Sequence, residues 1–228
     1  MAEAAEELGF DSVWATEHVL VGPEAADPYG RVYAPLVTLA WIAPFTERVA
    51  LGTSIVVLPL HHPVHLAKEA ASLQELSGGR LLLGLGMGWH EDEFRYLGVE
   101  LRGRGHRADE ALRLMRALWR GERSFAGRHW SFEDATFGPL PDPEPQLWFG
   151  GASRRTIARV LEHGGVWHPS RAGTPELVRR VRGKHPQLEI VVRTRPELAD
   201  ALLEAGADGV AVTLQDEAAM AAFVRRYR

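Results

Sequence analysis

The sequence predicts an α/β fold, a TIM (β/α)8 barrel whose first strand is missing at the N-terminus. Short apolar runs alternate with amphipathic segments throughout the 228 residues, which is typical of a parallel sheet covered by helices. Similar helix openings begin at Pro175 and Pro196, each after a strand, and indicate repeated β/α units. The pattern contains seven strands and begins with a helix, so the eighth strand would lie upstream of Met1. Either the barrel is open, or this start lies downstream of the natural one. We expect a single barrel domain over residues 1–228.

The composition excludes several classes of protein. Lys and Arg number 26 against 30 Asp and Glu, a net charge of −4, which argues against a polybasic nucleic-acid binder. The absence of cysteine excludes disulfide frameworks, thiol nucleophiles and cysteine-ligated metal sites. The apolar runs are too short to span a bilayer, and the acidic start carries no secretory signature. We therefore expect a cytoplasmic protein with no nucleic-acid and no membrane partner.

The expected strands are short runs rich in apolar residues. They cover residues 12–16, 49–58, 80–86, 146–149, 165–168, 189–194 and 209–214. The expected helices cover residues 1–8, 35–46, 63–76, 105–120 and 153–164, with three more that begin at residues 174, 195 and 216. An insertion over about 123–145 is expected to contain a hairpin at 125–132. The helix over 105–120 should bury one stripe, formed by Ala108, Leu112, Met115 and Trp119.

In such a barrel the functional groups lie at the carboxyl ends of the strands. Glu17 and His18 follow the first strand, and Thr53, Ser54 and Ile55 come late in the second.

Further candidates follow the later strands. Gly86 ends the third strand and is followed by His90, and His168 ends the fifth. Tryptophans are expected in the core, except Trp89 and Trp167, whose strand-end positions suit the lining of a pocket.

The segment Gly150-Gly151-Ala152-Ser153 leads from the fourth strand into a helix. Free backbone N–H groups, the positive end of the helix dipole and a hydroxyl favour a phosphate site there, and Arg154 and Arg155 add positive charge. A plain tight turn with a serine cap explains the same pattern, so both interpretations stay open.

Histidines at two places in the chain could take part in chemistry. An imidazole can donate or accept a proton near neutral pH, so His18 is a candidate acid–base group, and the alternative is a strand-end residue without a role. His61 and His65 are four residues apart, but Pro63 begins the helix and no acidic neighbour completes a ligand set, so we expect no metal. The chain has no G-x-S-x-G elbow and does not indicate a hydrolase.

Several motifs resemble those of the bacterial luciferase-like monooxygenase family. They are Glu6 to Trp14, Leu51 to Ser54, Pro63 to Arg80, Leu83 to Trp89, Glu93-Phe94, Gly98, Arg104-Gly105, Gly150 to Ser153 and Gly165 to Pro169. The similarity runs in order along essentially the whole chain. It is greatest to the branch that uses the deazaflavin coenzyme F420, whose members transfer hydride.

The resemblance implies a luciferase-like barrel with the cofactor ring at its mouth. A backbone bulge at Ser54-Ile55, often with a non-prolyl cis peptide, would support the ring, and Gly150 to Ser153 would hold the cofactor's phosphate. The family's glucose-6-phosphate dehydrogenases place an acidic residue and a catalytic histidine where this chain has Glu17 and His18. They carry a glutamate proton donor where this chain has Met87.

We therefore expect an oxidoreductase that transfers a hydride between F420 and a small organic substrate, and that forms a homodimer. The alternatives are an FMN-dependent luciferase-like monooxygenase and a non-catalytic barrel that serves as an assembly partner. His18 is the expected catalytic residue. The expected cofactor-binding residues are Glu17, Thr53, Ser54, Ile55, Gly86, His90, Gly150, Gly151, Ala152, Ser153 and His168.

Overall fold

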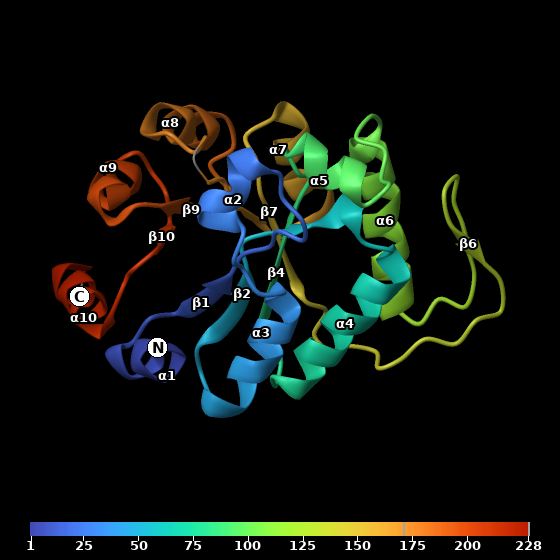
Figure 1. Ribbon diagram of the computed structural model, residues 1–228, viewed down its shortest axis with the longest axis horizontal. Helices are drawn as coiled ribbons and strands as arrows, with labels where there is room; N and C mark the ends of the chain where they lie inside the picture. Colours follow the sequence, from blue (N-terminus) through green and yellow to red (C-terminus); the bar gives the residue numbers. More distant parts are fainter. Residues whose placement is uncertain (171, 228) are drawn as a thin grey trace.

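The computed structural model describes residues 1–170 and 172–227 as a nearly closed parallel barrel surrounded by helices (Figure 1). Seven strands follow one another around it, and each pair along this path is parallel. They are β1 (Ser12–Ala15), β2 (Ala50–Thr53), β4 (Leu81–Gly86), β7 (Gln146–Phe149), β8 (Val166–Trp167), β9 (Glu189–Thr194) and β10 (Gly209–Val212). The short strand β3 (Val56–Val57) follows β2 in the chain and pairs with the same neighbour, β4.

Helices form the outer layer. The α-helices are α1 (Ala2–Leu8), α2 (Ala26–Tyr29), α3 (Pro35–Ile42), α4 (Pro63–Leu76), α5 (Glu91–Tyr96), α6 (Arg104–Trp119), α7 (Arg154–His163), α8 (Pro175–Lys184), α9 (Ala199–Glu204) and α10 (Glu217–Tyr227). The short 3-10 helices are η1 (Pro23–Ala25), η2 (Ala43–Phe45), η3 (Leu58–Leu60) and η4 (Pro196–Leu198). Within the described ranges, none of the helices is long and apolar enough to cross a membrane.

The sequence predicted most of these elements, and the exceptions lie beside the barrel mouth. All seven expected strands are present, and the expected stripe of α6 is buried. Trp41 of α3, expected in the core, is instead 73% exposed. The second expected strand is not continuous, because the chain leaves the ladder at Ser54 and Ile55 and resumes it as β3. The helices α2 and α5 were not expected. Three acidic residues in the first turn of α5 stabilise it through the helix dipole.

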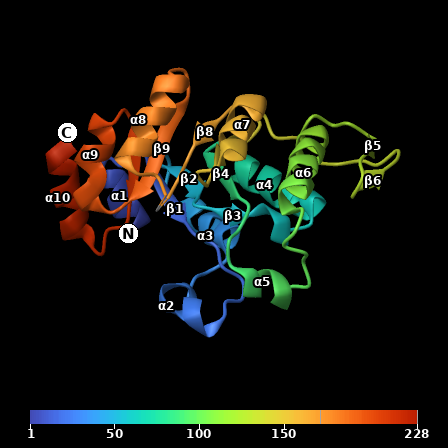
Figure 2. The same ribbon diagram turned by 90° about the horizontal axis from the view of Figure 1, so that it is seen from above.

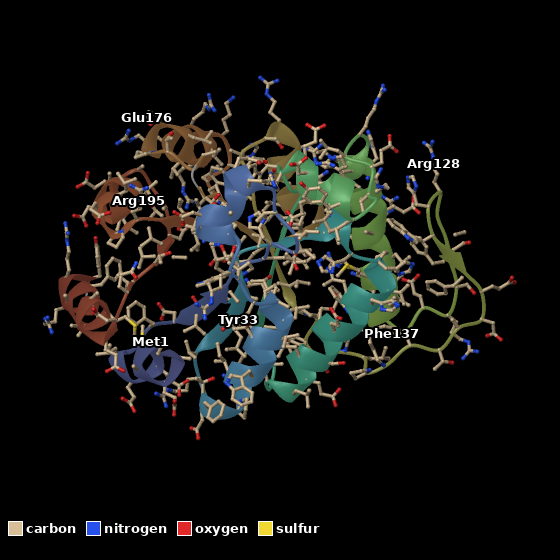
Figure 3. The ribbon with its side chains drawn as sticks, viewed as in Figure 1. Met1, Tyr33, Arg128, Phe137, Glu176 and Arg195 are labelled. Atoms are coloured by element: carbon tan, nitrogen blue, oxygen red, sulfur yellow. The ribbon has the colours of Figure 1, made fainter. Side chains whose placement is uncertain are left out.

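The expected hairpin is confirmed as the antiparallel pair β5 (Phe125–Ala126) and β6 (Ser131–Phe132). It lies at the periphery beyond α6 in both Figure 1 and Figure 2. The Glu110 carboxylate of α6 fixes the hairpin, since it accepts hydrogen bonds from the backbone N–H groups of His129 and Trp130 at 2.7 and 3.0 Å. Figure 3 labels Arg128, between β5 and β6, and Phe137, in the segment that follows β6.

Aromatic rings fill part of the barrel interior. The Trp14 ring stacks on the His168 ring with centroids 4.7 Å apart, and it contacts the Trp148 ring at 4.8 Å. Gly52 on β2 makes room for this group, because a Cβ there would lie 2.2 Å from the Trp14 ring. The position therefore requires the residue that has no side chain.

The barrel has one seam, between β10 and β1, which end the strand path and do not pair with each other. The helices α1 and α10 pack together outside the seam, and the rings of Phe10 and Phe223 stack there at 6.4 Å (Figure 2). A cavity of about 430 Å³ lies along it, lined mainly by apolar residues of the N-terminal segment and of β10 with the segment that follows.

We predict opposite effects for two glycine-to-alanine substitutions. Gly52→Ala drives a methyl group into the Trp14 ring and should lower the free energy of unfolding by about 1–3 kcal/mol. Gly183→Ala, within α8 and with open space around it, should raise it by up to about 1 kcal/mol. Urea unfolding measures both, and an unchanged stability of the Gly52 variant would contradict this packing.

Candidate functional site

A cavity of about 290 Å³ lies at the carboxyl ends of the strands and collects most of the expected site residues. All of the expected site residues line it except Thr53 and His90. Its walls come from the segments after β1, β2, β4, β7 and β8, together with Arg193 of β9. Residues that sequence reasoning did not assign also line it, namely Thr16, Tyr29, Val57, Gly88, Thr156, Ser170 and Arg193.

Ser54 and Ile55 form one wall of this cavity, where the chain passes from β2 to β3. The peptide bond between them is cis, which confirms the expectation. The Ser54 hydroxyl donates to Nε2 of His168 at 2.8 Å, and the Ser54 carbonyl accepts from Nη1 of Arg193 at 2.6 Å. The side chains of His168, after β8, and Arg193, on β9, therefore hold this wall by hydrogen bonds.

The glycines beside this wall make room for Ile55. A Cβ at Gly86 would lie 1.6 Å from Cδ1 of Ile55, and a Cβ at Gly150 would lie 3.1 Å from its Cγ2. Gly86 lines the cavity, but the main effect of its lack of a side chain is to leave space for the Ile55 side chain.

Thr53 and His90, expected to bind the cofactor, lie outside the cavity lining. Thr53 is fully buried, and its hydroxyl donates to the Gly84 carbonyl at 2.8 Å. His90 is also buried, and its Nε2 accepts the Gly22 N–H at 3.0 Å, which ties the segment after β1 to the segment after β4. Their side chains stabilise the framework around the cavity.

Glu17 acts on the backbone of β3. Its Oε2 accepts the N–H of Val57 at 2.7 Å, and both carboxylate oxygens lie 3.0 Å from Nε2 of His61. Burial disfavours the charged His61 ring, but the Glu17 carboxylate outweighs that effect and raises the pKa of His61. The sequence had suggested no acidic neighbour for His61, because Glu17 is 44 residues away along the chain.

His18 lines the cavity from the segment after β1. Its Nδ1 lies 3.1 Å from Oε2 of Glu93, the buried carboxylate in the first turn of α5. The ring also packs against the rings of Tyr29 and Trp89, with centroids 4.3 and 6.1 Å away. Trp89 lines the cavity as expected, whereas Trp167 is fully buried and does not.

Only some of the groups expected to bind a phosphate in Gly150 to Ser153 are free to do so. The Gly150 N–H donates to the Leu85 carbonyl at 2.8 Å, and the Ser153 hydroxyl caps α7 by accepting the Thr156 N–H. In the described part of the chain, the N–H groups of Gly151 and Ala152 have no hydrogen-bond partner.

The two arginines after this segment differ in their pairing. Arg155 is bound to Asp109 at 2.8 Å, so its charge is compensated, while Arg154 is exposed. The segment thus contains the serine cap, and it also leaves the N–H groups of Gly151 and Ala152 to bind an anion.

His168 is a neutral support under the cavity wall. Its ring is buried, which lowers its pKa to about 4. Its Nδ1–H donates to the Val191 carbonyl at 2.7 Å, so Nε2 is free to accept the Ser54 hydroxyl. The arrangement holds Ser54 with an uncharged ring at neutral pH.

A family model described as luciferase-like monooxygenase matches residues 1–192. The chain therefore belongs to the luciferase-like monooxygenase family.

Named relatives divide between two cofactors. The oxygenase component of the flavin-dependent trigonelline monooxygenase of Acinetobacter baylyi is 31% identical over 168 residues, which are 72% of this chain and 45% of that protein. The F420-dependent glucose-6-phosphate dehydrogenase of Kineococcus radiotolerans is 39% identical over 150 residues, 62% of this chain and 42% of that protein. The chain thus spans less than half the length of these two relatives.

Solved structures share the fold. The monooxygenase RslO1 from Streptomyces bottropensis superposes with a TM-score of 0.79 at 21% identity, over 98% of this chain and 88% of that one. An F420-dependent secondary alcohol dehydrogenase, in complex with an F420-acetone adduct, gives a TM-score of 0.71 at 21% identity, over 98% of this chain and 75% of that one. At this level of identity the likeness establishes the fold alone.

We predict that His168 makes stability depend on pH. Its pKa is lower in the folded protein than the ordinary value of 6.5, so the unfolded chain takes up the proton first as the pH falls. From pH 7 to pH 5 this group should remove about 2 kcal/mol of unfolding free energy. Between pH 7 and pH 5, the fall in unfolding free energy should therefore be smaller by that amount in His168→Gln than in the wild type. It should be the same as in the wild type in His106→Gln, which changes an exposed histidine. Equal losses in both variants, measured by urea unfolding, would show that His168 is not buried and neutral.

Proposed function

We propose that this protein is an oxidoreductase that transfers a hydride between F420 and a small organic substrate. The observation that carries the proposal is the position of His18, an imidazole on the wall of the same cavity that contains Ser54-Ile55 and Gly151-Ala152. F420-dependent dehydrogenases among the relatives support it, one of them 39% identical to this chain.

The residues of the cavity fit a planar cofactor with an anionic tail. Ser54 and Ile55 form one wall, which His168 and Arg193 hold by hydrogen bonds, and Gly86 and Gly150 beside it add no side chain of their own to the cavity. The free N–H groups of Gly151 and Ala152 precede the N-terminus of α7, where the helix dipole favours a phosphate. When bound, F420 supplies a ring carbon that accepts or releases a hydride.

In this proposal His18 moves the proton that accompanies the hydride. Hydride transfer to or from an alcohol or enone changes the charge on the substrate oxygen, and a positioned imidazole can supply or take that proton. Such help is typically worth about 10²–10⁴-fold in rate. Glu17 does not share this role, because its oxygens are bound to Val57 and His61.

A flavin-dependent monooxygenase is the second candidate. The similarity to the trigonelline monooxygenase, which covers 72% of this chain, favours it. FMN presents a tricyclic ring and a phosphate, as F420 does, so the same two walls of the cavity would serve both.

Titration of the pure protein with F420 and with FMN separates these candidates. We expect F420 to bind with a lower dissociation constant than FMN. In a substrate screen, we expect a secondary alcohol to reduce the bound F420. Tighter binding of FMN would overturn the F420 assignment in favour of the monooxygenase. Binding of neither would overturn both and favour a non-catalytic barrel.

We predict that two variants separate binding from turnover. His18→Ala should lower kcat by about 10²–10⁴-fold and leave the cofactor dissociation constant within a few-fold. Gly151→Val should weaken cofactor binding at least about tenfold, since it obstructs charge-assisted hydrogen bonds.

The control for the second variant is Gly164→Val, at the other end of α7. Both glycines have positive φ, +101° and +69°, so both substitutions strain the backbone, but only Gly151 lines the cavity. If the two valine variants bind the cofactor equally well, the anion site is wrong. If His18→Ala turns over normally, the acid–base role of His18 is wrong.

A further inference from the structure

We propose that Glu93 is a positioning residue that fixes the tautomer of His18. Its two carboxylate oxygens are bound to consecutive residues after β1: Oε1 accepts the Val19 N–H at 2.6 Å, and Oε2 lies 3.1 Å from Nδ1 of His18. The side chains of His18 and Glu93 are 8% and 2% exposed, so the pair is shielded from competing water.

The carboxylate determines which ring nitrogen carries the proton. A carboxylate can only accept hydrogen bonds, so Nδ1 of His18 is the protonated nitrogen in the neutral ring. Nε2 then holds a lone pair, and it is the ring's remaining polar atom for a ligand in the cavity. Selection of one tautomer by a carboxylate on the opposite nitrogen prepares an imidazole to accept a proton.

The pair also joins the two segments that form this side of the cavity. Glu93 and His18 are 75 residues apart, on the segments that contain α5 and α2. Figure 2 shows these two helices side by side, and the bond from Gly22 to His90 links the same segments. The tautomer of His18 therefore depends on the docking of α5.

Glu93→Gln should reverse the tautomer at almost constant shape. The Val19 N–H is a fixed donor, so the carboxamide oxygen of the variant side chain stays on it, and the amide NH₂ faces Nδ1 of His18. Because that NH₂ donates, Nδ1 becomes the acceptor and the proton moves to Nε2. The role of this change in turnover rests on the proposed function, and there kcat should fall, by at most the about 10²–10⁴-fold that acid–base help is worth.

The chain offers a matched control in Glu17→Gln. Glu17 likewise accepts one backbone N–H and binds one imidazole, but its partners are Val57 and His61. The substitution should therefore alter the signals of His61 and leave those of His18 in place.

The test is long-range ¹H–¹⁵N NMR of the full chain labelled at histidine, recorded above pH 8, with His18→Gln used to assign the signals. We expect His18 to be protonated mainly at Nδ1 in the wild type and in Glu17→Gln, and mainly at Nε2 in Glu93→Gln. A wild-type His18 protonated at Nε2 overturns the proposal without any variant, and so does an unchanged tautomer in Glu93→Gln. No cofactor or substrate is present in this measurement, so its result is independent of the titration with F420 and FMN.

Discussion

The packing of Ile55 among glycines is the constraint on which the cavity depends. The chain leaves the barrel ladder after Thr53, and the neighbouring strands must accommodate the displaced residues. A Cβ at Gly84 would lie 1.8 Å from the Thr53 carbonyl oxygen, and one at Gly86 would lie 1.6 Å from Ile55. One interruption between β2 and β3 therefore dictates two residues of β4. The same interruption brings Ser54 and Ile55 into the wall of the cavity.

Two glutamate–histidine pairs lie just after β1 and have different partners. Glu17 binds His61 and the backbone of β3, so it secures the strand that resumes after the interruption. His18 binds Glu93 and faces the cavity. Adjacent residues thus connect to opposite neighbours, because successive side chains of an extended chain point to opposite sides. One pair stabilises the wall, and the other holds an imidazole beside it.

The sequence predicted the strands and most of the cavity for a physical reason. Buried parallel strands must be apolar, and their carboxyl ends must meet at one edge, so residues such as His18 and Gly151 could be placed together. The apolar run over 49–58 carries no mark of its interruption, which the resemblance alone indicated. Glu93 and Tyr29 lie in the short helices α5 and α2, which are too short to show a hydrophobic period, so their approach to His18 depends on docking that periodicity does not encode.

The central claim is that the cavity holds a cofactor ring against the wall formed by Ser54 and Ile55. A crystal structure of the protein with F420 tests it most directly. The account predicts the ring against that wall, with the phosphate at the N–H groups of Gly151 and Ala152 and Nε2 of His18 facing the space beside the ring. A cofactor bound in the seam between β10 and β1, or bound with its phosphate away from Gly151, would contradict the account.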